Sequence, residues 1–184
     1  MIQSCFVKSD GIKIAQTELK YDDNHNLKVE VNFGTDNKIE TKISYKYDKK
    51  NQVIEEIHAD SANHQSWKKQ YIYNNKNLKT EVIDKTMNDS ISSKQIYRYD
   101  DLDRINELKM LDGQNRLIVT TSYKYDSRDN ILEIVKTPNN GTFPEKRTYE
   151  YKYDKYGNFV FFVEYINGVL QTTITREIKY FSSN

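Results

Sequence analysis

Cysteine, histidine, proline and glycine are all scarce in this chain of 184 residues, which has 1, 3, 2 and 6 of them. The single cysteine, Cys5, can form neither an internal disulfide framework nor a cluster of thiolate metal ligands. The only set of residues close enough in sequence to suggest a metal site is His58, Asp60 and His64, and its spacing matches no common ligand pattern. No nucleophile, metalloprotease or phosphate-binding motif occurs. The sequence therefore predicts no metal site, no cofactor and no enzymatic activity.

Long apolar runs are also missing. No stretch of about 18 apolar residues is present, so no transmembrane segment is predicted. The first ten residues, MIQSCFVKSD, lack the basic and apolar regions of a signal peptide. The 28 basic and 27 acidic residues are interspersed and almost cancel. A surface for binding nucleic acid needs clustered positive charge, so we expect no nucleic-acid partner.

Tyrosine is abundant instead, with 15 copies, and it recurs at a nearly constant interval. Six tyrosines that precede Asp or Asn are separated by 26, 26, 26, 26 and 28 residues, and a degenerate copy follows 27 residues later. A fixed period in this range is typical of a supersecondary unit repeated in tandem. We therefore expect one array over residues 1–184. Its marks are Tyr21, Tyr47, Tyr73, Tyr99, Tyr125, Tyr153 and Tyr180.

Each unit is predicted to be a β-hairpin, because two β-prone runs flank a short polar connection. In the second unit, Asp48 suits the first position of a type I turn, and Asn51 suits a left-handed residue that closes a three-residue loop with a bulge. The third unit differs: residues 74–77 are expected to form a two-residue turn that brings Tyr73 opposite Leu78. The predicted structural turn residues are Asp22, Asp48, Asn74, Asp100, Asp126, Asp154 and Gly157.

Period-two alternation sorts the side chains onto two faces of a sheet. The tyrosine pairs, such as Tyr45 and Tyr47, are expected to share one protected face. On a strict alternation, the returning strands place Leu27, Val29 and Val31 on this face. The same rule places Lys28, Glu30, Leu132, Ile134, Val160 and Phe162 on the opposite face.

These observations predict an all-β fold. About six to seven antiparallel hairpins, with about 14 strands, should form one long, twisted and curled meander sheet. The alternative is a closed barrel of about 14 strands. In an open sheet both end strands are exposed, which favours edge-to-edge self-association.

The segments YKYDKKNQV, YRYDDLDRI, YKYDSRDNI and YKYDKYGNF resemble the YD or RHS repeat. The resemblance covers almost the whole chain, although the Gly-Arg-Leu expected in the family's turn is not kept. It implies a coiled β-ribbon, which in large toxins forms a shell around a C-terminal cargo. It also implies a location in the cell envelope or outside the cell, where many bacterial proteins with this repeat are found.

The function expected from the sequence is that of a scaffold or binding module for a carbohydrate or a protein. Either the aromatic face or the variable loops at the opposite edge would form the contact surface. The candidate ligand-binding residues are Trp67, Tyr71, Tyr73, Tyr97 and Tyr99. Two alternatives are a container that encloses a small ligand or peptide and a fragment of a larger RHS-type toxin shell.

Overall fold

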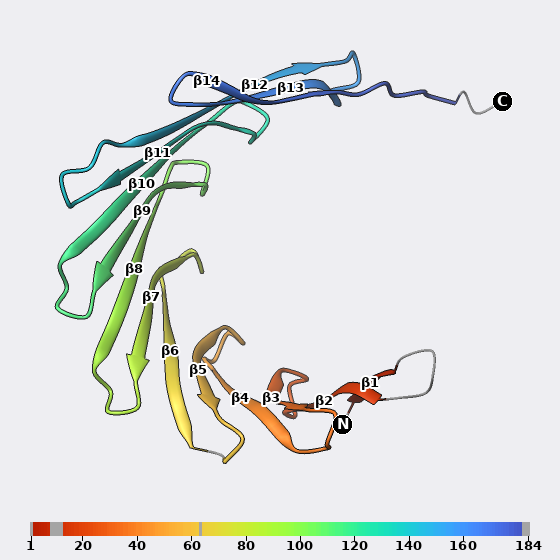
Figure 1. The fold of residues 1–184 in the computed structure, drawn as a ribbon, viewed down its shortest axis with the longest axis vertical. Helices are drawn as coiled ribbons and strands as arrows, with labels where there is room; N and C mark the ends of the chain where they lie inside the picture. The colour runs from red at the N-terminus through yellow and green to blue at the C-terminus, as the bar shows by residue number, and fades with distance from the viewer. Residues whose placement is uncertain (1, 8–12, 63, 182–184) are drawn as a thin grey trace. The chain divides into compact units, whose positions relative to one another are not determined.

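The computed structural model describes residues 2–7, 13–62 and 64–181, which form strands and turns without any helix (Figure 1). These residues accordingly contain no helix long and apolar enough to cross a membrane. The strand order of the sheet is the same as the order in the chain, so the predicted all-β meander is confirmed. The strands are β1 (Ile2–Val7), β2 (Lys13–Tyr21), β3 (Leu27–Phe33), β4 (Ile39–Tyr47), β5 (Val53–Ala59), β6 (Gln65–Tyr73), β7 (Lys79–Thr86), β8 (Ile91–Tyr99), β9 (Ile105–Asp112), β10 (Leu117–Tyr125), β11 (Ile131–Pro138), β12 (Glu145–Tyr153), β13 (Phe159–Ile166) and β14 (Val169–Thr175).

The sheet is open. Its order begins at β1 and ends at β14, and no ladder among the described residues joins these two strands. A barrel needs such a closing ladder, so the closed-barrel alternative was wrong. Strands β1 and β14 are therefore the two edge strands of the sheet.

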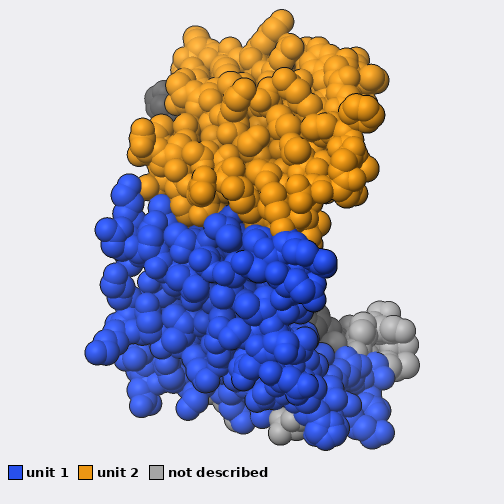
Figure 2. Space-filling view, turned by 90° about the vertical axis from the view of Figure 1, so that its left-hand side faces the viewer, with its two compact units in different colours: residues 1–96, 111–116 blue, residues 97–110, 117–184 orange. Residues whose placement is uncertain are grey.

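Contacts divide the chain into two compact units, coloured separately in Figure 2. Unit 1 consists of Met1–Ile96 and Leu111–Arg116, and unit 2 consists of Tyr97–Met110 and Leu117–Asn184. Strands β1 to β7 belong to unit 1 and β10 to β14 to unit 2, while β8 and β9 are divided between them. The single array over residues 1–184 stays a prediction.

One arrangement of hydrogen bonds closes the six described turns that follow a marker tyrosine. After β4, the Asn51 N–H donates to the Asp48 carbonyl at 3.1 Å, and the Asp48 N–H donates to the Gln52 carbonyl at 2.9 Å. Asp48 Oδ1 accepts the backbone N–H groups of Lys50 and Gln52 at 2.8 and 2.9 Å. The carboxylate thus satisfies two donors that the tight turn would leave without partners. The same two bonds are made by Asp22, Asn74, Asp100, Asp126 and Asp154.

The fourth residue of each of these turns is left-handed, with φ between 60° and 88°. The residues are His25, Asn51, Asn77, Asp103, Asp129 and Gly157. Asn77 has φ 65° and donates its N–H to the Asn74 carbonyl at 3.0 Å. The predicted two-residue turn in the third unit was therefore wrong, because asparagine tolerates the left-handed region and closes the same loop as elsewhere. The register places Lys79, and not Leu78, opposite Tyr73.

A bulge beside each turn shifts the face of the returning strand. Tyr47 lies opposite Val53, but Lys46 lies opposite Glu55, so Ile54 is an extra residue on β5. One extra residue transfers all later side chains of that strand to the other face of the sheet. The faces predicted by strict alternation therefore fail beyond the bulge.

The register shows which residues change face. Val29 lies opposite Ser44, whose side chain points away from the tyrosines. Phe162 lies opposite Tyr151 on the tyrosine face, and their ring centroids are 5.4 Å apart. The predictions of face for Val29, Val31, Glu30, Ile134 and Phe162 were wrong for this reason.

The apolar core is thin and divided between the two faces. Val82, on the tyrosine face opposite Tyr71, is 5% exposed, whereas its neighbour Ile83, on the other face, is 9% exposed. In unit 2, Val163 is 4% exposed. Within the described part of the chain, no large side chain is completely buried. Half-buried tyrosines and the aliphatic stems of lysines must therefore cover much of the sheet.

Paired charges complete the face opposite the tyrosines. Glu55 is buried, with Lys46 Nζ 2.6 Å from its Oε1 and Gln70 Nε2 donating to its Oε2 at 3.2 Å. Burial alone would raise the pKa of the Glu55 carboxyl, but the hydrogen bonds from these two side chains hold the pKa below its ordinary value. Glu55 is thus ionised and satisfied across β4, β5 and β6.

Three marker tyrosines also donate their hydroxyl to the strand that begins just after the preceding marker turn. Tyr73 Oη donates to the Val53 carbonyl at 2.8 Å, which connects the end of β6 with the start of β5. Tyr47 and Tyr125 bond in the same way to the carbonyls of Leu27 and Ile105. Each hydroxyl therefore fixes one unit to the turn of the unit before it, in addition to the packing of its ring.

Replacing Tyr73 with phenylalanine tests this connection. We expect the free energy of unfolding to fall by about 0.5–1.5 kcal/mol, because the Val53 carbonyl loses a donor while the ring still packs. Urea unfolding followed by circular dichroism measures the difference. Tyr156→Phe is the matched control, since Tyr156 is 60% exposed and should show no change. Equal losses in the two variants would contradict the role of the hydroxyl.

Candidate functional site

The best-defined aromatic cluster in unit 1 is centred on Trp67 in β6. The indole stacks on the His58 ring of β5, with ring centroids 3.5 Å apart and an interplanar angle of 15°. The two residues are opposite each other in the register, so the sheet itself positions the stack. Trp67 is 37% exposed. A large aromatic surface is thus held in one orientation and remains accessible.

Charged and hydroxyl groups border this stack. Tyr71 Oη donates to Glu56 Oε1 at 2.6 Å, and His58 Nε2 lies 3.5 Å from Glu56 Oε2. Burial, and then the hydrogen bond to Glu56, hold the pKa of Tyr71 far above its ordinary value. The phenol therefore stays a donor to the carboxylate, which in turn keeps the His58 side of the stack in place.

A second carboxylate lies on the other side of β6. Lys69 Nζ is 3.6 Å from Asp84 Oδ1, and Ser93 Oγ donates to Asp84 Oδ2 at 2.7 Å. The same ammonium lies 5.4 Å from the Trp67 ring centroid. Hydrogen-bonding groups therefore stand next to an aromatic surface, which is the combination found in many ligand sites.

Three of the five predicted ligand-binding residues share this face of unit 1. Trp67, Tyr71 and Tyr73 alternate along β6, but Tyr73 already donates its hydroxyl to a backbone carbonyl. Tyr97 and Tyr99 belong to unit 2. Burial raises the pKa of the Tyr99 phenol. The assignment of all five to one binding surface stays a prediction.

Sequence reasoning missed the residues contributed by neighbouring strands. Glu56 and Asp84 lie opposite Lys69 in the ladders of β5 and β7, and neither was a candidate. His58 was considered as a metal ligand or as a residue of the strand surface, but not as a partner of Trp67. A correct register was the missing signal, since it places His58 opposite Trp67, and Glu56 and Asp84 opposite Lys69.

The three residues considered for a metal site have other partners. His58 faces Trp67 and Glu56. Asp60 Oδ1 accepts the N–H groups of Ala62 and His64 at 3.0 and 2.9 Å. Among the residues that the structure describes, no group of three or more His, Cys, Asp or Glu is arranged to hold a metal ion.

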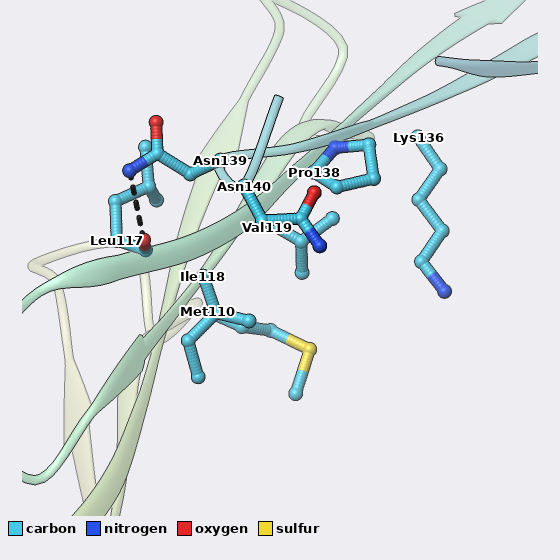
Figure 3. Close-up of a pocket in the computed structure, with 8 residues that line it drawn as sticks. All are labelled: Met110, Leu117, Ile118, Val119, Lys136, Pro138, Asn139 and Asn140. Atoms are coloured by element: carbon cyan, nitrogen blue, oxygen red, sulfur yellow. Dashed lines mark hydrogen bonds between the residues drawn. The ribbon is translucent and has the colours of Figure 1, made fainter. Parts of the chain in front are cut away.

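Unit 2 carries a hollow of about 480 Å³ beside the start of β10 (Figure 3). Its apolar lining comes from β9, β10 and the end of β11, and polar side chains stand at its margin. In Figure 3, Met110 is drawn below Val119 and Lys136 to the right of it. The lining residues are Met110, Leu117, Ile118, Val119, Lys136, Pro138, Asn139 and Asn140.

Unit 2 also contains a tyrosine–aspartate pair at a turn. Tyr153 Oη donates to Asp126 Oδ2 at 2.8 Å. Burial, and then this hydrogen bond, raise the pKa of Tyr153 to about 12. Burial alone would raise the pKa of Asp126, but the bonds from Tyr153, Asn130 and Arg128 outweigh it, and the pKa lies below its ordinary value.

The raised pKa of Tyr153 predicts a loss of stability in alkali. The ordinary pKa of tyrosine is 10.0 and the folded value is about 12. The stabilisation is therefore complete below pH 10.0 and is lost as the pH rises through about 12. Unfolding measured at a series of pH values should show this decline, and Tyr153→Phe should reduce it. Tyr156→Phe should leave the profile unchanged. An identical decline in the Tyr153 variant would contradict the assignment.

Comparisons with known proteins give the fold. No family model matches the chain, and no curated protein matches its sequence. Its structure is similar to that of TcdB2-TccC3-TEV, with a TM-score of 0.57 and 14% identity over 94% of this chain and 10% of that one. It is also similar to a porin-like protein from Bacteroides uniformis ATCC 8492, with a TM-score of 0.53 and 13% identity over 93% of this chain and 86% of that one.

The first of these proteins is an RHS-repeat toxin complex, and this chain spans about a tenth of its length. At 14% and 13% identity the likeness concerns the fold alone. It agrees with the all-β, open antiparallel sheet described above.

Proposed function

We propose that the chain is a non-enzymatic β-hairpin scaffold that binds a carbohydrate through the surface around Trp67. The observation that carries this proposal is the accessible indole, 37% exposed and fixed by stacking on His58. The apolar face of a sugar ring packs well on such a surface. Hydroxyl groups of the sugar would find donors and acceptors in Lys69 and Glu56.

Binding fits this site better than proton transfer. The Glu56 carboxylate accepts from Tyr71, and Asp84 is held by Lys69 and Ser93. In this arrangement both carboxylates hold the surrounding side chains in place by hydrogen bonds and an ion pair. They are therefore assigned a positioning role around the aromatic surface.

A glycan array followed by calorimetry on the strongest binder tests the proposal. We expect Trp67→Ala to weaken binding by about tenfold or more, because the stacking surface is lost. Tyr156→Ala removes an exposed aromatic ring from unit 2 and should leave the affinity unchanged. Circular dichroism checks that both variants are folded.

Two results would reject the carbohydrate assignment. The first is an array with no signal above background. The second is an equal loss of affinity in the two variants. A protein captured specifically in a pull-down and released by Trp67→Ala would then identify this surface as a protein-binding site instead.

A second candidate is that the array forms part of a larger shell. The alignment of 94% of this chain with a tenth of TcdB2-TccC3-TEV favours it. Sequencing of the complete reading frame tests this idea. Further repeats followed by a separate cargo domain are expected, and a gene that encodes only this array would contradict it.

A further inference from the structure

The hollow in unit 2 combines a buried floor with an exposed apolar rim. Val119 in the floor is 6% exposed, whereas Met110 and Ile118 at the rim are 38% and 48% exposed. Leu117 and Pro138 complete the apolar part of the lining. Large apolar side chains gathered around a concave surface are typical of a ligand site. The volume of about 480 Å³ suits a small molecule.

The polar groups at the margin that remain available are donors. The Lys136 ammonium forms no ion pair or hydrogen bond within the part of the chain that is described. Asn140 Oδ1 accepts from Thr142 N–H and Thr142 Oγ1 at 3.1 and 2.8 Å, which leaves its Nδ2 to donate. Asn139 is already committed, because its Nδ2 donates to the Leu117 carbonyl at 3.1 Å. An ammonium and an amide N–H next to an apolar floor are complementary to a carboxylate with an apolar chain.

We infer that this hollow is a binding site for a small amphipathic carboxylate, such as a medium-chain fatty acid. The apolar chain lies over Val119 between Met110 and Ile118, and the carboxylate accepts from Lys136 and Asn140. The site is separate from the Trp67 surface and does not depend on the proposed carbohydrate binding.

Methyl NMR of the methionines tests this inference on the full chain. Octanoate is titrated into protein labelled at the methionine methyl groups, and octanol and octylammonium serve as the uncharged and cationic probes. We expect a saturable shift of the Met110 methyl, while Met87, which is 59% exposed in unit 1, stays unchanged. Octanol should bind about tenfold more weakly than octanoate, because it lacks the charge-assisted hydrogen bond.

Two lysine variants test whether the Lys136 ammonium contributes to binding of the carboxylate. Lys136→Gln should weaken octanoate binding by about tenfold and leave the affinity for octanol unchanged. Lys49→Gln, an exposed lysine of unit 1, should change neither affinity. No shift at Met110, equal shifts at Met110 and Met87, or equal affinity for the three probes would overturn the inference. So would an unchanged affinity of Lys136→Gln for octanoate. If a peptide ending in an apolar residue and a free carboxylate displaces octanoate with higher affinity, the small-molecule assignment is overturned in favour of a peptide site.

Discussion

Replacing Val82 with aspartate is expected to lower the free energy of unfolding of unit 1 by about 3–5 kcal/mol. Val82 is 5% exposed and lies opposite Tyr71 on β6 and Gln95 on β8. A carboxylate at this position would lose its hydration without gaining a positively charged partner in the register. The loss should become smaller as the pH falls, since burial raises the pKa of a carboxyl and the protonated form is uncharged.

Urea unfolding of the unchanged protein and of Val82→Asp, at pH 7 and at pH 4, measures this effect. Met87→Asp is the matched control, because Met87 lies in the turn of the same hairpin and is 59% exposed. Its free energy of unfolding should change by less than about 0.5 kcal/mol. A Val82 variant as stable as this control would show that the thin core does not depend on Val82.

The second large effect is expected for Asp126→Ala in unit 2. Asp126 accepts the backbone N–H groups of Arg128 and Asn130 at 2.8 and 2.9 Å and the hydroxyl of Tyr153 at 2.8 Å. The Asn130 side-chain amide also donates to this carboxylate, at 3.2 Å from Oδ2. Removing the carboxylate leaves these four donors without this partner, and we expect a loss of about 2–3 kcal/mol. The pKa of Asp126 is lowered on folding. Its contribution is therefore present above the ordinary pKa of 3.8 and is lost as the pH falls through the folded value.

Thermal or urea unfolding between pH 2 and pH 7 checks both parts of this prediction. The stability of the variant should depend less on acid than that of the unchanged protein. Asp101→Ala is the control. Asp101 is the exposed second residue of the turn that follows Tyr99 in unit 2. If Asp101→Ala and Asp126→Ala lose the same stability, the turn bonds are not responsible.

Local chemistry allowed much of the fold to be predicted. Asp48 and Asn51 have side-chain and backbone preferences that specify a type I turn with a left-handed residue, and the structure contains this turn. Because the pattern repeats with a period of about 26 residues, one correctly assigned hairpin predicts the others. The strand count and the meander follow from that assignment.

The faces of the returning strands could not be predicted by alternation, because the bulge at Ile54 and its equivalents adds one residue. A pattern of alternating side chains does not by itself indicate where a one-residue bulge occurs. Including the bulge that accompanies a three-residue loop would have placed Phe162 on the tyrosine face. The hydroxyl bond from Tyr73 to Val53 needed the same register.

The candidate site was predicted only in part for a related reason. Trp67 and Tyr71 are recognisable in the sequence as aromatic residues of one strand. Glu56 and Asp84 come from two other strands and are charged, so only the cross-strand register shows that they lie opposite Lys69, whose ammonium is next to the indole. The hollow beside Val119 left no pattern in the sequence, because it depends on how the side chains of the neighbouring strands β9, β10 and β11 meet across the sheet.

The agreement between strand order and chain order has a consequence for folding kinetics. Sheets usually form slowly, because pairing of distant segments requires large loops to close before any contact is gained. Here each strand finds its partners within one or two turns of the chain, so the relative contact order is low. Nucleation can start at any hairpin and spread to the next, as in other repeat proteins. We therefore expect refolding on the timescale of mixed α/β domains rather than that of all-β sandwiches.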